Sequence, residues 1–389
     1  MIIWWAVACA VAFCCFSNSL NFYIKADKNN KPDTIIYFSF TQKQKIELNN
    51  YFNNKHSKQG FNGVVLVGQK DSVFYSKSYG FSDYEKHDSL TLNSTFQLAS
   101  VSKQFTAVAI LQLYQKGLLK LTDSIQKYYP DFPYKGITIH QLLTHRSGLP
   151  NYLYFMQHIP TTYDTILYNQ DIVNEMIIKK PKAYYRPNRR YHYSNTGYAL
   201  LAAIVEKVSG QTFNEYIHKN IFTPLNMDAS FTYSDLLLGV KTNTTTGYLY
   251  RWRKSEDNYL DGVLGDKGVF CSANDLLKWD QGLYTNKIIN RDTLELAFRP
   301  VGKPKFFKSN YGYGWRMYHW RNDSVKVLFH SGWWHGYKSL LMRIQRDSAT
   351  IIVLKNRSTG ASINSKKLIK ILYPIKTNIV DSTNMAITD

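Results

Sequence analysis

Apolar runs separated by short polar breaks predict strands near both ends of the chain, with helices between them. Near the start, two apolar or alternating stretches are joined by a polar turn and are typical of paired strands. Toward the end, short runs rich in β-branched and apolar residues indicate further strands. The expected strands are Gly63–Gly68, Ser72–Tyr79, Trp315–Trp320, Val325–Phe329, Lys338–Ile344 and Thr350–Leu354.

The middle of the chain carries the strongest helical patterns. Aliphatic runs after Ser100 and after Asn195 each predict a buried helix, and Gly117 ends the first of them. Between Met156 and Tyr185 the chain is rich in Tyr, Ile and Lys but shows no clear periodicity. Further helices are expected before Lys58, around Asn214–Asn220, at Asp275–Leu283 and at Ile363–Leu372.

Strands at both ends around a helical middle predict an α/β (α+β) domain with a mostly helical part inserted. We expect this domain over residues 41–375, its α/β part at about 41–120 and 290–375 and its helical part at about 121–289. Residues 20–40 are polar and indicate a linker, and residues 376–389 indicate a loose tail.

The first residues are predicted to be a secretory signal peptide, residues 1–19. Residues 2–16 form an apolar run that is too short for a comfortable membrane span, and the small residues Ser17–Ser19 follow it. No Lys or Arg precedes Lys25, which is atypical of a signal, so a late-placed start or an uncleaved or lipid-modified anchor is the alternative. We therefore expect a secreted, periplasmic or cell-envelope protein, with membrane contact only through this leader.

Cysteine content and charge limit the classes of fold and of binding partner. Cys9, Cys14 and Cys15 lie in the leader, which leaves Cys271 alone and excludes a disulfide framework in the domain. The net charge of +20 indicates a solvated surface, with attraction to an acidic cell wall as the alternative. No basic stripe is interleaved with aromatics, so no nucleic-acid partner is expected. The histidines are scattered without ligand spacing, so we expect no metal and no cofactor.

Ser100 and Lys103 form the most informative pair of residues. At the start of a helix, residues i and i+3 share one face, about 5–6 Å apart. Partial burial would lower the pKa of Lys103 and let it accept a proton. Serine is a weak nucleophile that needs such a base within hydrogen-bond reach.

Two more clusters supply further parts of an acyl-transfer site. Tyr193 offers a phenol and Asn195 an amide just before a buried helix. His330 and Gly332 end a predicted strand, where glycine lets a ligand backbone approach closely. Each cluster alone is more often structural than catalytic, as a helix cap, a core aromatic or a strand-end histidine. The three together favour catalysis.

Ser100-x-x-Lys103, Tyr193-x-Asn195 and His330-x-Gly332 together resemble the three motifs of the serine β-lactamase and penicillin-binding-protein superfamily. The resemblance runs from about residue 60 to about 356. It is closest to the class C-like branch, which includes D,D-carboxypeptidases, D-aminopeptidases and esterases. It implies a β-lactamase/transpeptidase-like fold, in which an antiparallel sheet is flanked by helices and the site lies between the sheet and the helical part. Matching phrases surround the motifs at Phe61–Val67, Ile137–Pro150 and Gly265–Gly268.

The resemblance also assigns roles. Ser100 would be the nucleophile, with Lys103 and Tyr193 sharing the work of the base. The backbone N–H groups of Ser100 and Trp333 would form the oxyanion hole. Asn195 would hold a substrate amide, and His330 would line the leaving-group side. The substrate-binding residues expected in this way are Asn195, His330, Ser331, Gly332 and Trp333.

One departure concerns the third motif. Relatives that act on penicillins usually begin it with Lys, whose charge faces a substrate carboxylate, whereas this chain has His330. A histidine with a pKa near ~6.5 is mostly neutral at pH 7 and attracts a carboxylate weakly. This argues against efficient penicillin hydrolysis. The neighbouring Trp333, Trp334 and Tyr337 indicate an aromatic cleft that suits an acyl ester or a hydrophobic peptide.

We therefore predict an exported serine hydrolase that acts through a serine acyl-enzyme on amide or ester substrates, with D-amino-acid peptides or small esters favoured. The partner would be a small molecule or a peptide, including a cell-wall peptide. A β-lactamase and a non-hydrolytic, penicillin-binding-like sensor or cell-wall-binding protein remain alternatives. The oligomeric state stays open.

Overall fold

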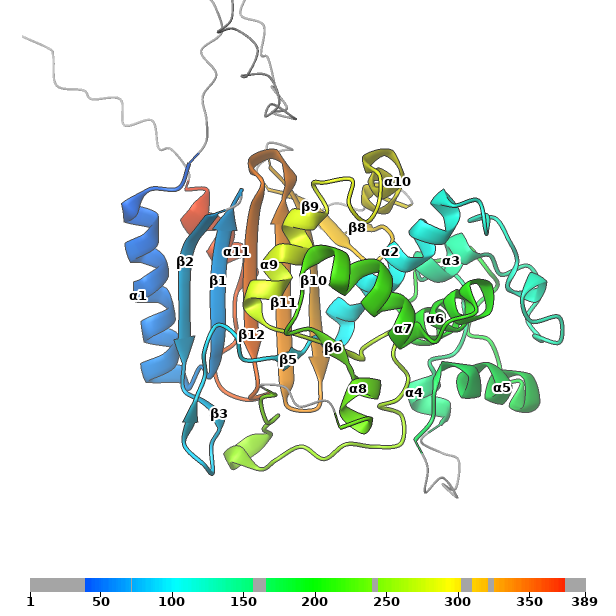
Figure 1. Cartoon of the computed structure of the whole chain (residues 1–389), viewed down its shortest axis with the longest axis horizontal. Helices are drawn as coiled ribbons and strands as arrows, with labels where there is room; N and C mark the ends of the chain where they lie inside the picture. Colours follow the sequence, from blue (N-terminus) through cyan, green and yellow to red (C-terminus); the bar gives the residue numbers. More distant parts are fainter. Residues whose placement is uncertain are drawn as a thin grey trace, which may run out of the picture. The chain divides into compact units, whose positions relative to one another are not determined.

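The computed structural model in Figure 1 describes residues 39–70, 72–156, 166–239, 244–301, 310–320 and 325–374. The predicted signal peptide, the predicted tail and nearly all of the predicted linker lie outside these residues. From Phe40 onward, the described residues belong to one compact unit. Within them, no helix has the length and apolar content that a membrane span requires.

A seven-stranded sheet forms the centre of this unit, and each strand is antiparallel to its neighbours. The strand order is β2-β1-β12-β11-β10-β9-β8, so the first long strand, β1, pairs with the last one, β12 (Figure 1). The strands are β1 (Gly63–Gln69), β2 (Ser72–Tyr79), β8 (Asn310–Tyr311), β9 (Arg316–Trp320), β10 (Val325–Trp334), β11 (Tyr337–Ile344) and β12 (Ala349–Lys355).

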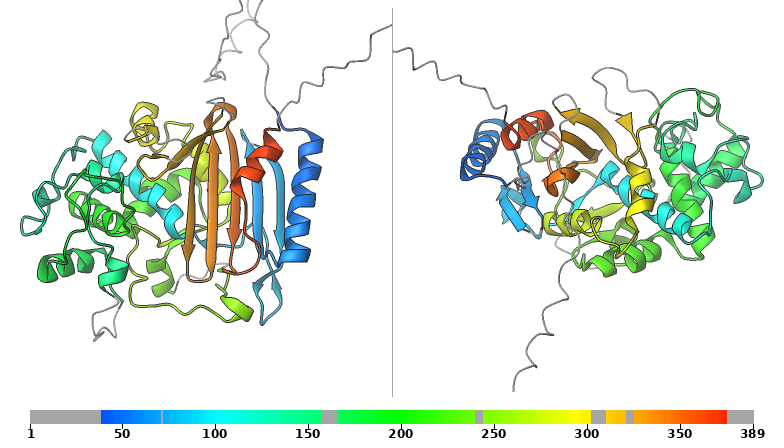
Figure 2. Two further views of the ribbon diagram at one scale, coloured as in Figure 1. Left: turned by 180° about the vertical axis from the view of Figure 1, so that it is seen from behind. Right: turned by 90° about the horizontal axis from the view of Figure 1, so that it is seen from above.

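Two helices from opposite ends of the described chain cover one face of the sheet. Figure 2 shows α1 (Gln42–Gln59) and α11 (Ser365–Leu372) side by side there. The Gln44 side chain donates a 2.7 Å hydrogen bond to the Leu372 carbonyl and ties them together. α1 begins at Thr41, whose backbone N–H bonds the Gln44 side chain in a capping box, an arrangement that satisfies donors at a helix start.

The other face packs on α9 (Ala273–Gly282), and α2 (Ser102–Gln115) lies beside α9. The Phe105 and Trp279 rings stack with their centroids 4.1 Å apart and join these two helices. α2 then packs on α6 (Thr196–Ser209) and the helical part. The remaining helices are α3 (Ile139–Leu143), α4 (Tyr152–Phe155), α5 (Asn169–Lys179), α7 (Phe213–Ile217), α8 (Tyr233–Leu237) and α10 (Arg291–Glu295).

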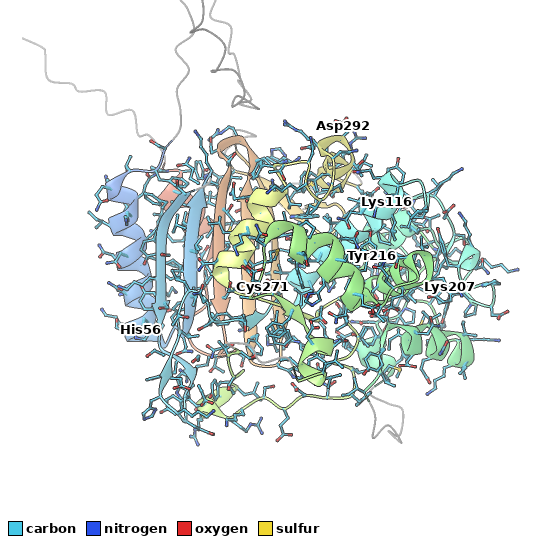
Figure 3. All side chains as sticks on the ribbon, in the orientation of Figure 1. His56, Lys116, Lys207, Tyr216, Cys271 and Asp292 are labelled. Atoms are coloured by element: carbon cyan, nitrogen blue, oxygen red, sulfur yellow. The ribbon has the colours of Figure 1, made fainter. Side chains whose placement is uncertain are left out.

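Short strands connect the sheet to the helical part. β5 and β6 each pair with β7, which carries Cys271. Cys271 is labelled in Figure 3; it is buried and has a free thiol. Burial raises the pKa of this thiol well above its usual value, so it stays protonated. The short strands are β3 (Phe81–Asp83), β4 (Asp88–Ser89), β5 (Phe96–Gln97), β6 (Phe231–Thr232) and β7 (Val269–Cys271).

The predicted fold class is confirmed, and the long strands lie within a few residues of their expected bounds. Two elements differ from the expectation. β10 continues to Trp334 rather than ending at Phe329, so the third motif lies inside the strand. The stretch from Met156 to Tyr185, which showed no clear periodicity, contains the eleven-residue helix α5.

Candidate active site

Ser100 lies in a 3₁₀ turn, Ala99–Val101, that leads directly into α2. The residue before it, Ala99, has a φ of +48°, in the left-handed region that residues with a Cβ seldom adopt. Such strain persists only where the surrounding structure enforces it, and it is commonest at functional sites. Ser102 is structural, because its hydroxyl accepts a 3.1 Å hydrogen bond from the Val269 N–H and joins α2 to β7.

The predicted catalytic side chains meet at the Ser100 hydroxyl. Lys103 Nζ lies 3.0 Å from Ser100 Oγ, and the Tyr193 hydroxyl lies 2.9 Å from the same oxygen. Lys103 comes from the first turn of α2, whereas Tyr193 comes from the loop before α6. Their convergence gives the serine two neighbours that can take or relay its proton.

Lys103 is completely buried, and this burial controls its charge. Its Nζ donates 2.8 Å hydrogen bonds to the Asn195 side-chain oxygen and to the Asp266 carbonyl. Burial lowers the pKa of Lys103 to about 7; the Asp266 carboxylate opposes this shift and the Arg316 cation adds to it. Near neutral pH a large fraction of Lys103 is therefore uncharged and able to act as a base.

The pKa of Tyr193 is shifted in the opposite direction. Burial raises its pKa well above 10, although its hydrogen bond to Ser100 and the Arg316 charge pull the pKa down. The phenol is therefore protonated at neutral pH. This arrangement favours Lys103 as the base and Tyr193 as a relay that accepts one proton while passing on another.

His330 lies on β10 and is 1% exposed. Its Nδ1 lies 2.8 Å from the Ser331 carbonyl oxygen, which can only accept, so Nδ1 carries the proton. Nε2 then accepts from the Tyr311 hydroxyl at 3.1 Å. Burial holds the pKa of His330 well below 6.5, and the nearby Arg316 and Lys103 charges add to this effect. His330 is therefore a neutral imidazole fixed in one tautomer.

Gly332 is required by a close approach of two main chains. A Cβ at this position would lie 2.2 Å from the Leu98 carbonyl oxygen and 3.0 Å from the Ala99 Cβ. No other residue type lets β10 approach the turn that carries Ser100 so closely. The strand and the nucleophile are thereby held side by side.

The Ser331 and Trp333 side chains lie on the exposed side of β10. Ser331 is exposed and the Trp333 side chain is 69% exposed. Together with Lys338 and Lys355 they line a cavity of about 340 Å³ beside the start of α11. A direct side-chain contact of Trp333 with a substrate at Ser100 is therefore not part of this geometry.

The Trp333 backbone, in contrast, is oriented as the resemblance implies. Trp334 pairs with Tyr337 across a two-residue turn. In an antiparallel pair, the backbone groups of successive residues point alternately toward the partner strand and away from it. The N–H of Trp333 consequently points away from β11, toward the free edge of β10. No described strand pairs with this edge beyond Phe329.

Arg316 is a member of the site that the sequence did not reveal. It lies on β9 opposite Phe329, with its guanidinium carbon 5.3 Å from the Tyr193 ring centre and 5.7 Å from that of Tyr311. Its charge lowers the pKa of both Lys103 and His330. A cation therefore lies beside the histidine that replaces the expected lysine. Arg316 and His330 come together only because β9 pairs with β10.

His145 is a second residue whose role was not predicted, although it lies in a phrase that matched the family. Its ring centre lies 4.2 Å from that of Tyr193 and 4.6 Å from that of Tyr311. Its Nδ1 accepts a 3.3 Å hydrogen bond from the Ser194 N–H, and burial holds its pKa well below 6.5. This neutral imidazole packs against the relay phenol and helps fix its position.

One group of side chains has the composition of a metal site. Asp257, Asp261 and His335 place ligand atoms within 4.8 Å of one another. Asp261 already accepts hydrogen bonds from Trp334 Nε1 at 2.7 Å and from His335 Nε2 at 3.0 Å. These bonds fix the turn between β10 and β11, and Asp257 separately accepts a 3.0 Å hydrogen bond from the Tyr233 hydroxyl.

Comparison with known proteins agrees with this geometry. The family model described as Beta-lactamase matches residues 48–372. Penicillin-binding protein 4* of Bacillus subtilis (strain 168) is 35% identical over 331 residues, which cover 81% of this chain and 72% of that protein.

Two solved structures show the same arrangement of elements. An octameric penicillin-binding protein homologue from Pyrococcus abyssi superposes with a TM-score of 0.70 and 27% identity, covering 80% of this chain and 73% of the other. A D-amino acid amidase from Ochrobactrum anthropi SV3, complexed with L-phenylalanine, gives a TM-score of 0.65 and covers 80% and 91%. At 24% identity, the latter likeness concerns the fold alone.

Proposed function

Because the chain belongs to the beta-lactamase family, we propose that it is an exported serine hydrolase that cleaves amide or ester bonds through an acyl-enzyme on Ser100. Membership of the family supports a serine hydrolase in general. The observation that carries the proposal is the contact of the Ser100 hydroxyl with both Lys103 and Tyr193. D-amino-acid peptides are the substrates that we favour, with small esters next.

In the first step, neutral Lys103 takes the Ser100 proton, either directly or through Tyr193, as Oγ bonds to the substrate carbonyl carbon. General-base help of this kind is typically worth about 10²–10⁴ in rate. The N–H groups of Ser100 and Trp333 stabilise the oxyanion, and one such donor is typically worth about 10²–10³.

The tetrahedral intermediate then collapses. The bond to the leaving amine or alcohol breaks, and that group receives the proton held by Lys103 through Tyr193. This leaves Ser100 esterified by the acyl group. In the second step, water loses a proton to the same base, attacks the ester carbonyl and releases the acid, which restores the Ser100 hydroxyl.

Arg316 favours a substrate with a carboxylate. His330 is neutral and attracts an anion weakly, but the Arg316 guanidinium lies beside it and beside Tyr193. A substrate carboxylate near the third motif would gain a charge-assisted hydrogen bond from this cation. The C-terminal carboxylate of a short peptide meets this requirement, and a simple ester does not. The name of the 35% identical relative, a penicillin-binding protein, agrees with such a substrate, because penicillins carry a carboxylate.

Intact-protein mass spectrometry tests the nucleophile. The protein and its Ser100→Ala variant are incubated with a fluorophosphonate, a penicillin and a p-nitrophenyl ester. We expect an adduct on Ser100 with the fluorophosphonate and steady turnover of the ester, both lost in Ser100→Ala. The absence of any Ser100 adduct would refute the proposal and favour the non-hydrolytic sensor.

Substrates that differ in one feature at a time distinguish between a peptidase, an esterase and a β-lactamase. We expect D-alanyl-D-alanine peptides to be cleaved faster than their L-residue isomers and faster than neutral esters of the same acyl group. Rapid penicillin turnover would instead assign a β-lactamase. For export, the N-terminal sequence of the protein isolated from the cell envelope or medium should begin near residue 20, whereas an intact leader would indicate an anchor.

A further inference from the structure

A second buried lysine lies behind the catalytic one. Lys267 Nζ donates hydrogen bonds to the Tyr152 hydroxyl at 2.5 Å and the Val263 carbonyl at 3.2 Å, and it lies 3.5 Å from Asp266 Oδ1. The Tyr152 hydroxyl donates to the same Oδ1 at 3.0 Å. All three residues of this cluster, Tyr152, Asp266 and Lys267, are at most 2% exposed. Buried charges are costly unless they are paired, so this cluster needs an explanation.

The cluster contacts Lys103 of the first motif and residues that closely follow the other two motifs. The Asp266 carbonyl accepts the 2.8 Å hydrogen bond from Lys103 Nζ. The Tyr152 N–H donates a 2.7 Å hydrogen bond to the hydroxyl of Thr196, the residue after Asn195. Lys267 Nζ lies 5.1 Å from the ring centre of Trp334, the residue after Trp333. The cluster therefore lies where a change in one charge reaches the base Lys103.

We propose that Lys267 is a positioning residue: its ammonium neutralises the Asp266 carboxylate and holds the Asp266 peptide against Lys103, so that Lys103 can serve as the base. This inference rests on the proposed function, since it assumes that Lys103 accepts the Ser100 proton. Lys267 itself touches neither Ser100 nor the reacting atoms. It acts through Asp266.

Electrostatics give the direction of the effect. The Asp266 carboxylate favours the charged form of Lys103, whereas Lys103 and Lys267 repel each other. Without Lys267, the carboxylate would be uncompensated and the pKa of Lys103 would rise. The titratable and charged groups that face Lys103 are Asp266 and Lys267 before β7, Tyr193 and Tyr198 at the start of α6, His145 after α3, Arg316 on β9 and His330 on β10.

The acid limb of the pH profile of kcat/KM reports this pKa, because only neutral Lys103 is competent. In Lys267→Met we expect the limb to move to higher pH by on the order of 1 unit. In Asp266→Asn we expect it to move to lower pH, because the carboxylate that favours the ammonium is gone. The double variant should lie between the two. The substrate is a p-nitrophenyl ester, whose neutral acyl group avoids a charge effect on binding.

Lys207→Met is the matched control, because Lys207 lies exposed on α6 and is labelled in Figure 3. It makes the same chemical change away from the cluster and should leave the profile unmoved. Circular dichroism and gel filtration test whether each variant folds. The pH dependence of Ser100 labelling by a fluorophosphonate gives a second, independent profile.

The outcomes separate the two proposals. Turnover that survives in Ser100→Ala refutes the proposed function. Turnover that depends on Ser100, with an acid limb unmoved in Lys267→Met and Asp266→Asn, overturns only the role of Lys267. If Lys267→Met does not fold, Lys267→Gln replaces it in the same comparison, and its acid limb should again lie at higher pH than that of the unchanged protein. If every cluster variant fails to fold while Lys207→Met folds, the cluster serves stability and the inference is wrong.

Discussion

At the scale of single residues, burial converts an ordinary lysine into a base. Lys103 has no exposed surface, and desolvation lowers its pKa to about 7. The hydroxyl of Ser100 needs no unusual property of its own, since the proton acceptor lies 3.0 Å away. The chemistry of the site thus depends on how completely the surrounding structure excludes water from one amine.

The first prediction concerns pH. Since Lys103 must be neutral to accept a proton, kcat/KM should rise with pH through about 7 and level off above it. Lys103→Met should lower kcat/KM by about 10²–10⁴ and abolish this limb. Ester hydrolysis at closely spaced pH values measures both. A limb retained in Lys103→Met would assign it to another group.

The second prediction concerns Arg316. Arg316→Met should lower kcat/KM for a carboxylate-bearing peptide by about 10-fold or more, the equivalent of one charge-assisted hydrogen bond of about 1.5–3 kcal/mol. For a neutral ester at pH values above the acid limb, the rate should hardly change. The acid limb itself should move to higher pH, because the Arg316 cation lowers the pKa of Lys103.

Arg253→Met, an exposed substitution, is the control for this comparison. An equal loss for both substrates in Arg316→Met would mean that the arginine supports the site structurally and does not bind the carboxylate. Steady-state kinetics with the two substrates distinguishes these readings.

The sequence reveals a residue of the site only where its role depends on neighbours along the chain. Ser100 and Lys103 share one helical turn, so their spacing alone indicates their relation. Arg316 carries no such signal, because its place beside His330 depends on strand pairing. Lys267 lay in a matching phrase, but only burial beside Tyr152 shows its environment.

At the scale of elements, the contact of β10 with the turn before α2 is the critical junction. Gly332 allows it, and a methyl group there would overlap the Leu98 carbonyl. The third prediction is that Gly332→Ala lowers the free energy of unfolding by about 1–3 kcal/mol, the usual cost of overpacking. It should also reduce activity strongly, because the strand must move away from Ser100.

Ser331→Ala serves as the stability control for this substitution. Its side chain is exposed, so the free energy of unfolding should change by at most about 0.5 kcal/mol. Urea unfolding followed by fluorescence measures both variants. A Gly332→Ala protein with normal activity would contradict the assigned contact.

Element prediction succeeded where one face is strongly apolar and failed where the signal is mixed. The strand β12 is buried throughout, and its run of Ile, Val and Leu made it easy to find. The end of β10 contains His, Ser and Gly, so its continuation was missed. Helix α5 did carry a signal, because its buried residues Ile172, Val173 and Met176 have helical spacing within an otherwise polar stretch.

At the scale of the whole molecule, one hydrophobic core joins the sheet to the helical part. Ile352 and Leu354 of β12 belong to the same buried cluster as Leu200 and Ile204 of α6. The site lies between these two parts and draws residues from both. Loss of either part should therefore remove the site.

The fourth prediction follows from this shared core. Unfolding should be a single cooperative transition, in which tryptophan fluorescence and esterase activity disappear at the same denaturant concentration. Trp279 and Trp315 are both at most 1% exposed and report on the core. Activity lost well before fluorescence would show that the helical part unfolds separately.

The architecture was predictable only in part. Alternating patterns indicated strands at the ends and helices between, which determine the fold class. They do not determine that β1 pairs with β12, about 290 residues away, or that β10 is the strand beside the nucleophile. The resemblance implied an antiparallel sheet, and the pairing of distant strands required the structure.

The free edge of β10 has a consequence for the conformation of the substrate. From His330 to Trp334, alternate backbone groups of this strand face no other described strand. An extended peptide can add to such an edge as one more strand, read through its main chain rather than its side chains. A site that binds a peptide through its main chain accepts many side chains but not a change in the chirality of the residues. The enzyme would then be broad in the residues it accepts and strict in their chirality.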